Sequence, residues 1–456
     1  MKERENLGSR LGFILLSAGC AIGIGNVWRF PYMVGENGGG IFVLFYVLFL
    51  LILGVPIMTM EYSMGRASRK SIMPAYKMLE KTGTKWHLVG YMAMAGNYIL
   101  LMFYSVVSGW MLRYFVLMVT GGFDKASTSD VKSIYQSMMD NPLVMIFYMV
   151  ITMVITVIVC SLGLQNGVEK VTKIMMIALI CIMIVLGINS IVLPGASEGI
   201  SFYLKPNMDN VRNVGIGKVL YAALNQSFFT LSLGIGSMEI FGSYIAKERS
   251  LAGEAILVAG LDTFVAVVAG FITIPACFAY GVAPDSGPSL IFLTLPNVFV
   301  SLPAGRIWGS LFFLFMYFAA LSTMIGVFEN DVSFLIDIHG MHRKKASMIA
   351  GIIITVGSIP CALGFNVWKS FQPLKAGNTI MDLEDFILSN LMLPIGALIC
   401  CIFCTTKYGW GFDNYINEVN NGEGLKVSRK LSWYFKYVLP IVIGFLVIYG
   451  LITYFS

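Results

Sequence analysis

The chain has 456 residues, of which 57% are hydrophobic and only 12% are charged, and its mean hydropathy is +0.78. Soluble globular domains carry about 25% charged residues, so this composition excludes a soluble protein and predicts an integral membrane protein. A net charge of +6 can indicate nucleic-acid binding in a soluble chain, but in a membrane protein the distribution of the charges matters more.

Eleven apolar segments are long enough to cross a membrane. A hydrocarbon layer about 30 Å thick takes roughly 20 residues of α-helix. We therefore predict an all-α integral membrane protein with eleven transmembrane helices, near residues 10–33, 39–64, 87–120, 143–161, 167–193, 216–246, 251–281, 304–338, 345–363, 381–404 and 434–453.

The distribution of Lys and Arg predicts the orientation of these helices. Residues 1–9 are short and charged, and no small-residue cleavage pattern follows them, so we expect no cleaved signal peptide. With a cytoplasmic amino terminus, about 21 of the 31 Lys and Arg lie in cytoplasmic stretches, as the positive-inside rule requires. An odd number of spans then places the carboxyl terminus outside, in a multi-pass protein of the inner (plasma) membrane.

The first span is a poor helix. Gly19, Gly23 and Gly25 each cost about 1 kcal/mol relative to Ala in a helix, and Asn26 and Arg29 follow them. Non-helical backbone is tolerated inside a membrane only where it faces protein or a water-filled cavity. We predict that this segment is unwound and forms part of a binding site.

The sixth span repeats this irregularity, because polar side chains and two glycines fall between Gln226 and Gly236. Matching interruptions in two halves of a chain are typical of inverted-repeat transporters with a site near the middle of the membrane. The aliphatic fourth and fifth spans are expected to face lipid and neighbouring helices. We predict a cytoplasmic segment at 1–9, five-helix repeats at 10–193 and 216–404 with discontinuous first and sixth helices, an extracellular loop at 194–215, a cytoplasmic loop at 405–433, and an eleventh helix with the C-terminus at 434–456.

Two later spans carry further polar residues. Asp262 lies within the seventh span, where a carboxylate costs roughly 2.5 to 3.5 kcal/mol on insertion scales. Ser322 and Thr323 lie in a run of small residues in the eighth span. Such residues serve either close helix packing or cation binding, and their place beside a broken helix favours a cation site.

The cysteines indicate neither disulfides nor a metal centre. All eight lie within or at the ends of predicted spans, so no disulfide framework is expected. Cys401 and Cys404 have the spacing of metal ligands, but no His or second Cys pair accompanies them. Because no nucleophile and base pair or phosphate-binding loop is recognisable either, we expect no enzymatic activity.

Four groups of residues resemble motifs of the neurotransmitter:sodium symporters, specifically the bacterial amino-acid transporters with eleven transmembrane helices. They are residues 23–31 (GIGNVWRFP), 36–40 (ENGGG), 61–66 (EYSMGR) and 229–234 (FTLSLG). The resemblance covers nearly the whole chain and implies sodium-coupled import of an amino acid by alternating access. It implies a small-molecule substrate and the lipid bilayer as partners, with no nucleic acid and no obligatory protein partner.

The resemblance also implies two sodium sites and a substrate site. Sodium prefers oxygen ligands, and an unwound segment releases carbonyl groups that a helix would otherwise use. The first ion would be held by Ala21, Asn26, Thr230 and Asp262 together with the substrate carboxylate, and the second by Gly19, Ile22, Ala319, Ser322 and Thr323. The substrate would contact Ala21, Gly23, Ile24, Gly25, Leu100, Tyr104, Val107, Phe229, Thr230, Ser232, Gly234, Ile235, Met324 and Val327.

Position 23 bears on the substrate. Relatives that carry monoamines have an aspartate there, whereas Gly23 leaves room for a substrate with its own carboxylate. The amides of Ile24 and Gly25 at a helix end suit that carboxylate, to which Tyr104 would donate a hydrogen bond. The apolar side-chain pocket implies neutral hydrophobic L-amino acids, aliphatic or aromatic.

Chloride is expected to be dispensable. Eukaryotic relatives use chloride near the first sodium, with a Tyr and a Gln that match Tyr46 and Gln226. A carboxylate at Asp262 can replace this anion. The resemblance therefore implies chloride-independent transport.

The resemblance further implies an outer and an inner gate. Arg29 is expected to pair with Asp385 on the extracellular side, and Arg4 with Asp337 on the cytoplasmic side, with Tyr244 nearby. In relatives a glycine and a proline ten residues apart in the fifth span permit local unwinding for inward release, whereas this chain has Gly167 and Ile177 at these positions. An ion channel, or a carrier of the same fold driven by another ion, remains the alternative function.

Overall fold

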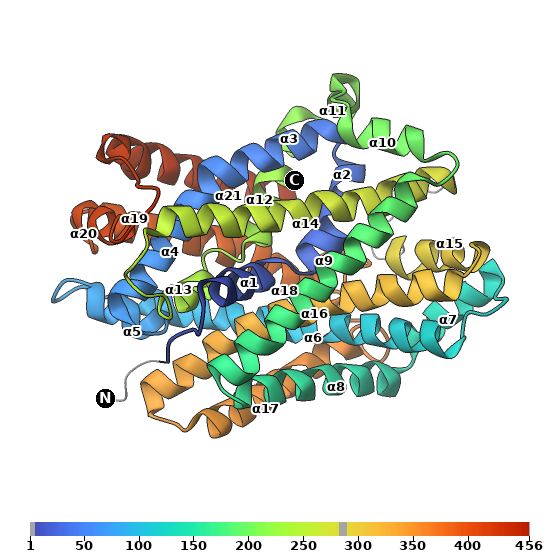
Figure 1. The fold of residues 1–456 in the computed structure, drawn as a ribbon, viewed down its shortest axis with the longest axis horizontal. Coiled ribbons are helices and arrows are strands. Elements are labelled where there is room, and N and C mark those ends of the chain that lie inside the picture. Colours follow the sequence, from blue (N-terminus) through green and yellow to red (C-terminus); the bar gives the residue numbers. More distant parts are fainter. Residues whose placement is uncertain (1–4, 282–289, 456) are drawn as a thin grey trace.

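The computed structural model describes residues 5–281 and 290–455. Within these ranges the chain is helical, with one isolated bridge between Arg249 and Glu423 and no β-strand. The long helices lie side by side along the longest axis of the molecule (Figure 1). The predicted all-α fold is confirmed.

The described residues form a series of helices joined by turns and loops. In the first half they are α1 (Arg10–Ala21), η1 (Gly25–Arg29), α2 (Phe30–Glu36), α3 (Gly40–Phe49), η2 (Leu50–Gly54), α4 (Val55–Ser68), α5 (Ile72–Leu79), α6 (Leu88–Thr120), α7 (Thr128–Asp140), α8 (Pro142–Ser161), η3 (Leu164–Glu169), α9 (Lys170–Ile191), α10 (Ala196–Leu204) and α11 (Met208–Val214). In the second half they are α12 (Ile216–Thr230), α13 (Ser237–Gly242), α14 (Leu251–Ala279), η4 (Leu290–Thr294), α15 (Leu295–Ser301), α16 (Gly305–His339), α17 (Arg343–Leu363), α18 (Ile380–Phe386), η5 (Ile387–Met392), α19 (Leu393–Thr405), α20 (Phe412–Val419), η6 (Arg429–Leu431), η7 (Tyr434–Val438) and α21 (Leu439–Phe455).

Nine helices in the described ranges are long and apolar enough to cross a membrane, and a tenth span is the bent pair formed by Arg10–Ala21 and Gly25–Glu36. These ten match ten of the predicted spans. The remaining prediction, at 216–246, corresponds to α12 and α13, which are only 15 and 6 residues long and are separated by a turn at 231–236. The count of eleven and the inverted repeat therefore stay predictions.

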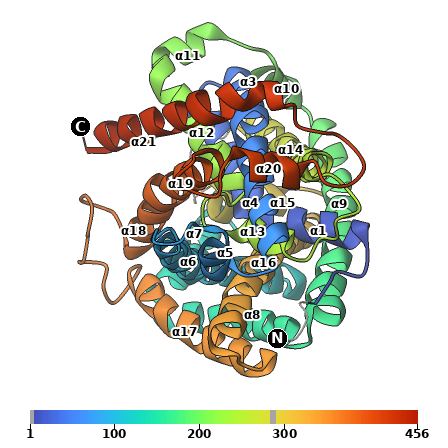
Figure 2. The same cartoon turned by 90° about the vertical axis from the view of Figure 1, so that its left-hand side faces the viewer.

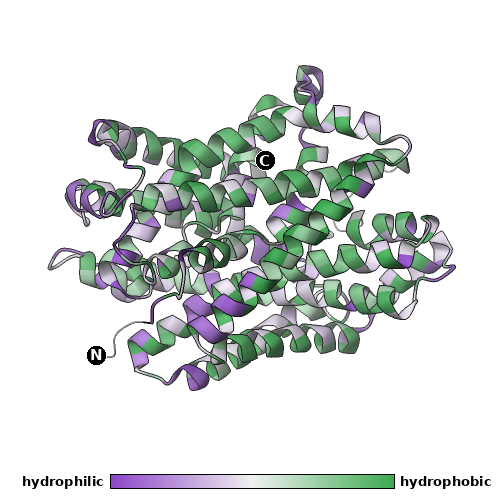
Figure 3. Ribbon diagram, viewed as in Figure 1, coloured by the Kyte–Doolittle hydropathy of each residue, from purple (hydrophilic) through white to green (hydrophobic). Residues whose placement is uncertain are grey.

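The ends of the molecule contain short helices that the sequence analysis assigned to loops. The predicted loop at 194–215 contains α10 and α11, and the loop at 405–433 contains α20. The amino terminus lies at the same end as α5 and α20, whereas α7, α10 and α15 lie at the other end (Figure 1). Polar residues gather at these two ends, and apolar residues dominate the long helices between them (Figure 3).

The helices differ strongly in burial. The apolar windows of α16 and α6 are 83% and 67% buried, whereas those of α8 and of Leu164–Ile191 are each 39% buried. Viewed from the end that carries the amino terminus, α8, α9, α17 and α21 lie around the periphery (Figure 2). The fourth and fifth spans thus face outward as expected, and α6 and α16 are available to line a central site.

Candidate functional site

The first helix is interrupted where its glycines predict a break. Helix α1 ends at Ala21, Ile22 adopts an extended conformation, and the chain resumes at η1 with a bend of 56°. The amide of Gly23 donates to the side-chain Oδ1 of Asn26 at 3.1 Å. In an unbroken helix that amide would donate to the carbonyl of Gly19, so the break releases this oxygen.

The five residues predicted to hold the second sodium ion converge beside this break. The Thr323 hydroxyl lies 3.1 Å from the carbonyl oxygen of Ile22 and 3.4 Å from that of Gly19. The Ser322 hydroxyl lies 3.0 Å from the Ala319 carbonyl oxygen and 3.4 Å from that of Ile22. Three carbonyls and two hydroxyls thus form an all-oxygen set, which is the donor chemistry that a hard cation such as sodium prefers.

Asp262 on α14 joins the two broken helices. Its Oδ1 accepts a hydrogen bond from Asn26 Nδ2 at 2.8 Å, and the Thr230 hydroxyl lies 3.0 Å from Oδ2. The Tyr46 hydroxyl also donates to Oδ2, at 3.3 Å. The carboxyl group is fully buried and has three hydrogen-bond donors from three different elements. The side chains predicted for the first sodium site therefore lie together.

The sixth helix is interrupted over a longer stretch than the first. After Thr230 the backbone turns through Ser232, Gly234 and Gly236, whose φ angles are +50°, +93° and +75°. The amide of Gly234 donates to Glu61 Oε1 at 2.6 Å. Sequence reasoning assigned no role to Glu61, although a buried carboxylate in the second span is a signal for one.

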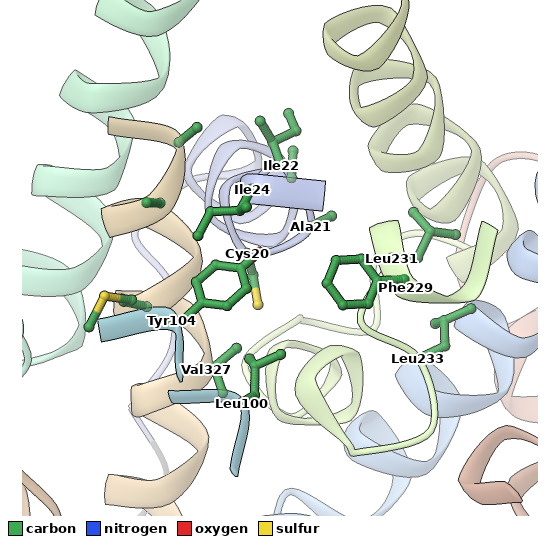
Figure 4. Packing of buried hydrophobic residues seen from close by; sticks show 14 of the residues in the cluster. Cys20, Ala21, Ile22, Ile24, Leu100, Tyr104, Phe229, Leu231, Leu233 and Val327 are labelled. Carbon is green, nitrogen blue, oxygen red and sulfur yellow. The ribbon is translucent and has the colours of Figure 1, made fainter. Parts of the chain in front are cut away.

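The predicted substrate residues surround both interruptions. The amides of Gly25 and Ile24 approach the hydroxyl of Tyr104. The rings of Tyr104 and Phe229 lie next to the broken first helix, on either side of Cys20, with Leu100 and Val327 nearby (Figure 4). All members of the predicted apolar pocket are buried, namely Leu100, Val107, Phe229, Ile235, Met324 and Val327.

Two glycines of the first break are required for close approach. A Cβ atom at Gly23 would lie 2.4 Å from Thr323 Oγ1 and 2.7 Å from Tyr104 Oη. A Cβ atom at Gly25 would lie 2.9 Å from the ring of Phe229. A side chain at position 23 would therefore displace residues of both the cation set and the substrate set.

Gln226, which the resemblance linked to chloride, contacts the first break. Its Nε2 donates to the carbonyl oxygen of Gly25 at 2.8 Å, while its Oε1 is buried and has no hydrogen-bond partner in the described part of the chain. Gln226 thus orients the backbone next to the predicted substrate amides.

The two residues predicted to form the outer gate lie close together. Arg29 Nη1 lies 3.5 Å from Asp385 Oδ1 and donates to the Ser389 hydroxyl at 3.1 Å. Ser389 donates in turn to Asp385 Oδ1 at 2.6 Å, and the guanidinium carbon of Arg29 lies 4.2 Å from the ring centroid of Phe229. Sequence reasoning missed Ser389, which lies one helical turn after Asp385 and ties the pair together.

The inner gate is only partly described. Arg4 lies outside the described residues, and Asp337 pairs with Lys70 at 3.6 Å and accepts from the amide of Ser71 at 2.7 Å. Tyr244 donates to Glu329, at 2.6 Å. The proximity of Arg4 to Asp337 stays a prediction.

Sequence reasoning missed three charged residues of this inner region. Glu329 is fully buried and forms an ion pair with Arg343. Asp331 is also fully buried, and neither of its carboxylate oxygens has a hydrogen-bond partner in the described ranges. The run Glu329-Asn330-Asp331 in the middle of an apolar span was a signal for such a region, because each charge is costly there.

The fifth span is continuous from Leu164 to Ile191. The amino-terminal segment is fastened to its beginning, because Glu169 accepts hydrogen bonds from the Gly8 amide at 2.8 Å and the Ser9 hydroxyl at 3.2 Å. This span, which lacks the proline that relatives carry, is therefore helical throughout.

Comparisons with known proteins agree with this geometry. The model of the sodium:neurotransmitter symporter family matches residues 4–130 and 126–456. An uncharacterized sodium-dependent transporter of Bacillus subtilis is 33% identical over 450 residues, which cover 98% of each chain. GABA transporter 2 of Mus musculus, a sodium- and chloride-dependent protein, is 24% identical over 99% of this chain and 81% of its own.

A solved structure has the same fold. The crystal structure of MhsT in complex with L-phenylalanine superposes with a TM-score of 0.89 and 35% sequence identity, covering 98% of this chain and 100% of that one. Family members are transporters and not enzymes, and the sodium-dependent relatives indicate the use of sodium. The chain belongs to the sodium:neurotransmitter symporter family.

Proposed function

We propose that this symporter imports neutral hydrophobic L-amino acids, aliphatic or aromatic, together with sodium. The observation that carries this proposal is the contact geometry of Gly23, where a Cβ atom would lie 2.4 Å from Thr323 Oγ1. The aspartate of monoamine carriers does not fit there without displacing its neighbours. The amides of Ile24 and Gly25, which approach the Tyr104 hydroxyl, support a substrate that brings its own carboxylate instead.

The proposed coupling uses two sodium ions. The second ion takes the oxygen set of Gly19, Ile22, Ala319, Ser322 and Thr323. The first takes Ala21, Asn26, Thr230 and Asp262 and is completed by the substrate carboxylate. Because the substrate carboxylate is itself a ligand of the first sodium ion, the substrate and this ion would each tighten the binding of the other.

The side-chain specificity follows from the pocket. Its six apolar residues are buried, and the glycines on either side of Ile235 allow the backbone to adapt to a bulky side chain. The complex of MhsT with L-phenylalanine supports an aromatic amino acid as one substrate of this chain.

Asp262 is proposed to make transport independent of chloride. Its carboxyl group accepts hydrogen bonds from Asn26, Thr230 and Tyr46, and in its ionised form it would supply a negative charge beside the proposed first sodium site. Exchange of Asp262 for Asn is expected to weaken transport or to make it chloride-dependent, because the neutral amide no longer balances the sodium charge.

The wider proposal is alternating access in the inner (plasma) membrane. Two inverted five-helix repeats would alternately expose the site, with Arg29 and Asp385 closing it outside and Arg4, Asp337 and Tyr244 closing it inside. The amino terminus would be cytoplasmic, the carboxyl terminus extracellular, and eleven helices would cross the bilayer.

The experiment that tests this function is uptake into proteoliposomes. An inward sodium gradient should drive accumulation of labelled L-phenylalanine, with competition from apolar amino acids but not from monoamines or charged amino acids. Replacement of external chloride by gluconate should leave uptake unchanged. Single-channel currents, or uptake that needs no sodium gradient, would contradict the proposal.

A further inference from the structure

The backbone around Ile235 has no helical hydrogen-bond pattern to hold it. Ile235 lies between Gly234 and Gly236, whose φ angles are +93° and +75°, and helix α13 begins only at Ser237. Its position must therefore be determined by contacts with other elements.

Two buried asparagines supply these contacts. The carbonyl oxygen of Ile235 accepts hydrogen bonds from Asn97 Nδ2 on α6 at 2.7 Å and from Asn330 Nδ2 on α16 at 3.4 Å. Both asparagine side chains are fully buried. Helices α6 and α16, whose apolar windows are the most buried among the candidate membrane spans of the described residues, thus meet at one carbonyl group of the sixth-helix interruption.

The orientation of Asn97 is determined by its other partners. Its Nδ2 also donates to the Ala93 carbonyl oxygen at 2.8 Å, and its Oδ1 lies 3.3 Å from the Ser237 hydroxyl, which donates to it. A flipped amide would place Oδ1 against two carbonyl oxygens and lose these bonds. Asn97 therefore presents a donor to Ile235.

These asparagines lie next to the side-chain pocket. Asn97 and Leu100 are three residues apart on α6, and Asn330 and Val327 are three residues apart on α16, so each pair shares a helix face. The side chain of Ile235 packs against α6 as well, because a Cβ atom at Gly96 would lie 2.8 Å from Ile235 Cγ2. The carbonyl group and the side chain of Ile235 thus both contact the face of α6 that carries Leu100.

We infer that Asn97 and Asn330 are positioning residues that set the place of Ile235 and thereby the selectivity of the pocket for substrate side chains. They act through Ile235 and not by contact with the substrate. The inference rests on the proposed amino-acid site and adds to it the residues that determine its discrimination by size.

The test compares affinity ratios in purified full-length protein. Binding of L-phenylalanine and of L-alanine is measured in sodium for the wild type and for Asn97→Leu, Asn97→Asp and Asn330→Ala. Asn97→Asp keeps an acceptor for Ser237 but loses the amide donor. The matched control is Ser105→Ala, since Ser105 is also a buried polar residue of α6 but donates to Ser358 on α17, at 2.9 Å.

The ratio of the two affinities should change by about five- to tenfold in each asparagine variant that remains monodisperse, the effect of losing one buried hydrogen bond. The ratio should stay unchanged in Ser105→Ala. Equal losses for both ligands, with an unchanged ratio in Asn97→Asp and Asn330→Ala, would overturn the inference. Wild-type protein that binds neither ligand in sodium would instead contradict the proposed function.

Discussion

The two interrupted helices use glycine for different physical reasons. In the first, Gly23 and Gly25 do not have positive φ angles, but a Cβ atom at either would collide with a side chain of the site. In the sixth, Gly234 and Gly236 have φ angles of +93° and +75°. The first break thus needs glycine for space, whereas the second needs it for backbone conformation.

This difference has a consequence for function. The first break is short. It presents carbonyl groups at the end of α1 and amide groups at the start of η1, and these two helix ends hold them in position. The second is longer, depends on Glu61, Asn97 and Asn330 for its shape, and lies beside the side-chain pocket. Substitutions at the first break should therefore affect the binding of ions and of the substrate carboxylate. Substitutions at the second break should affect folding and selectivity.

The largest effect is expected for Gly234→Ala. The new Cβ atom would lie 2.1 Å from the backbone oxygen of Leu393, and Ala is disfavoured at a φ of +93°. Together these costs amount to about 2 to 5 kcal/mol of folding free energy. Thermal unfolding of the detergent-purified protein measures the loss.

Gly377→Ala is the control for the conformational cost alone, because Gly377 has a φ of +89° with no atom within 4 Å of a new Cβ. This control should lose only about 1 to 2 kcal/mol. Equal unfolding temperatures of Gly234→Ala and Gly377→Ala would show that close packing at the sixth break is unimportant.

Gly23→Ala should fold but bind poorly. Its Cβ atom would displace the hydroxyls of Thr323 and Tyr104, so we expect L-phenylalanine binding in sodium to weaken by about 100-fold, ~2.7 kcal/mol. Equilibrium binding measures this effect. Gly260→Ala, which introduces a methyl group into open space on α14, should bind like the wild type, and an equally unaffected Gly23→Ala would refute the need for space at the first break.

Thr323→Ala should act on sodium. Removal of one oxygen from the set at the first break is expected to raise the half-saturating sodium concentration about tenfold, ~1.4 kcal/mol. The sodium titration of substrate binding measures this shift. Thr263→Ala serves as the control, because within the described residues the Thr263 hydroxyl donates to the Ala259 carbonyl of its own helix, at 2.8 Å. If the half-saturating sodium concentration were the same in both variants, Thr323 would not be a ligand of the sodium ion.

The smallest effect is expected for Ser389→Ala. The half-exposed pair of Arg29 and Asp385 remains, but loses the hydroxyl that bridges it. Since such pairs contribute about 0 to 1 kcal/mol, dissociation of bound L-phenylalanine should become about two- to threefold faster. Stopped-flow release measures the rate, with Ser301→Ala on α15 as the control, and slower release from Ser389→Ala would contradict a closing role.

The breaks and the residues at them could be predicted from the sequence because their signals are local. Glycines and polar residues inside an apolar span indicate unwinding, and the resemblance placed Thr323 and Asp262 at the site. The contact of Asn97 with Ile235 joins residues 138 positions apart, so no local pattern indicates it. Similarly, α10 and α11 are only 9 and 7 residues long, too short to form an apolar run like those of the spans, and they were predicted as loop.

The most direct test of coupled binding at the two breaks is the affinity of the purified protein for L-phenylalanine in sodium and in an equal concentration of potassium. Because the substrate carboxylate would complete the coordination of one sodium ion, affinity in sodium should be at least about 100-fold higher, and L-phenylalanine should tighten sodium binding in return. Equal affinities in the two salts would contradict the account.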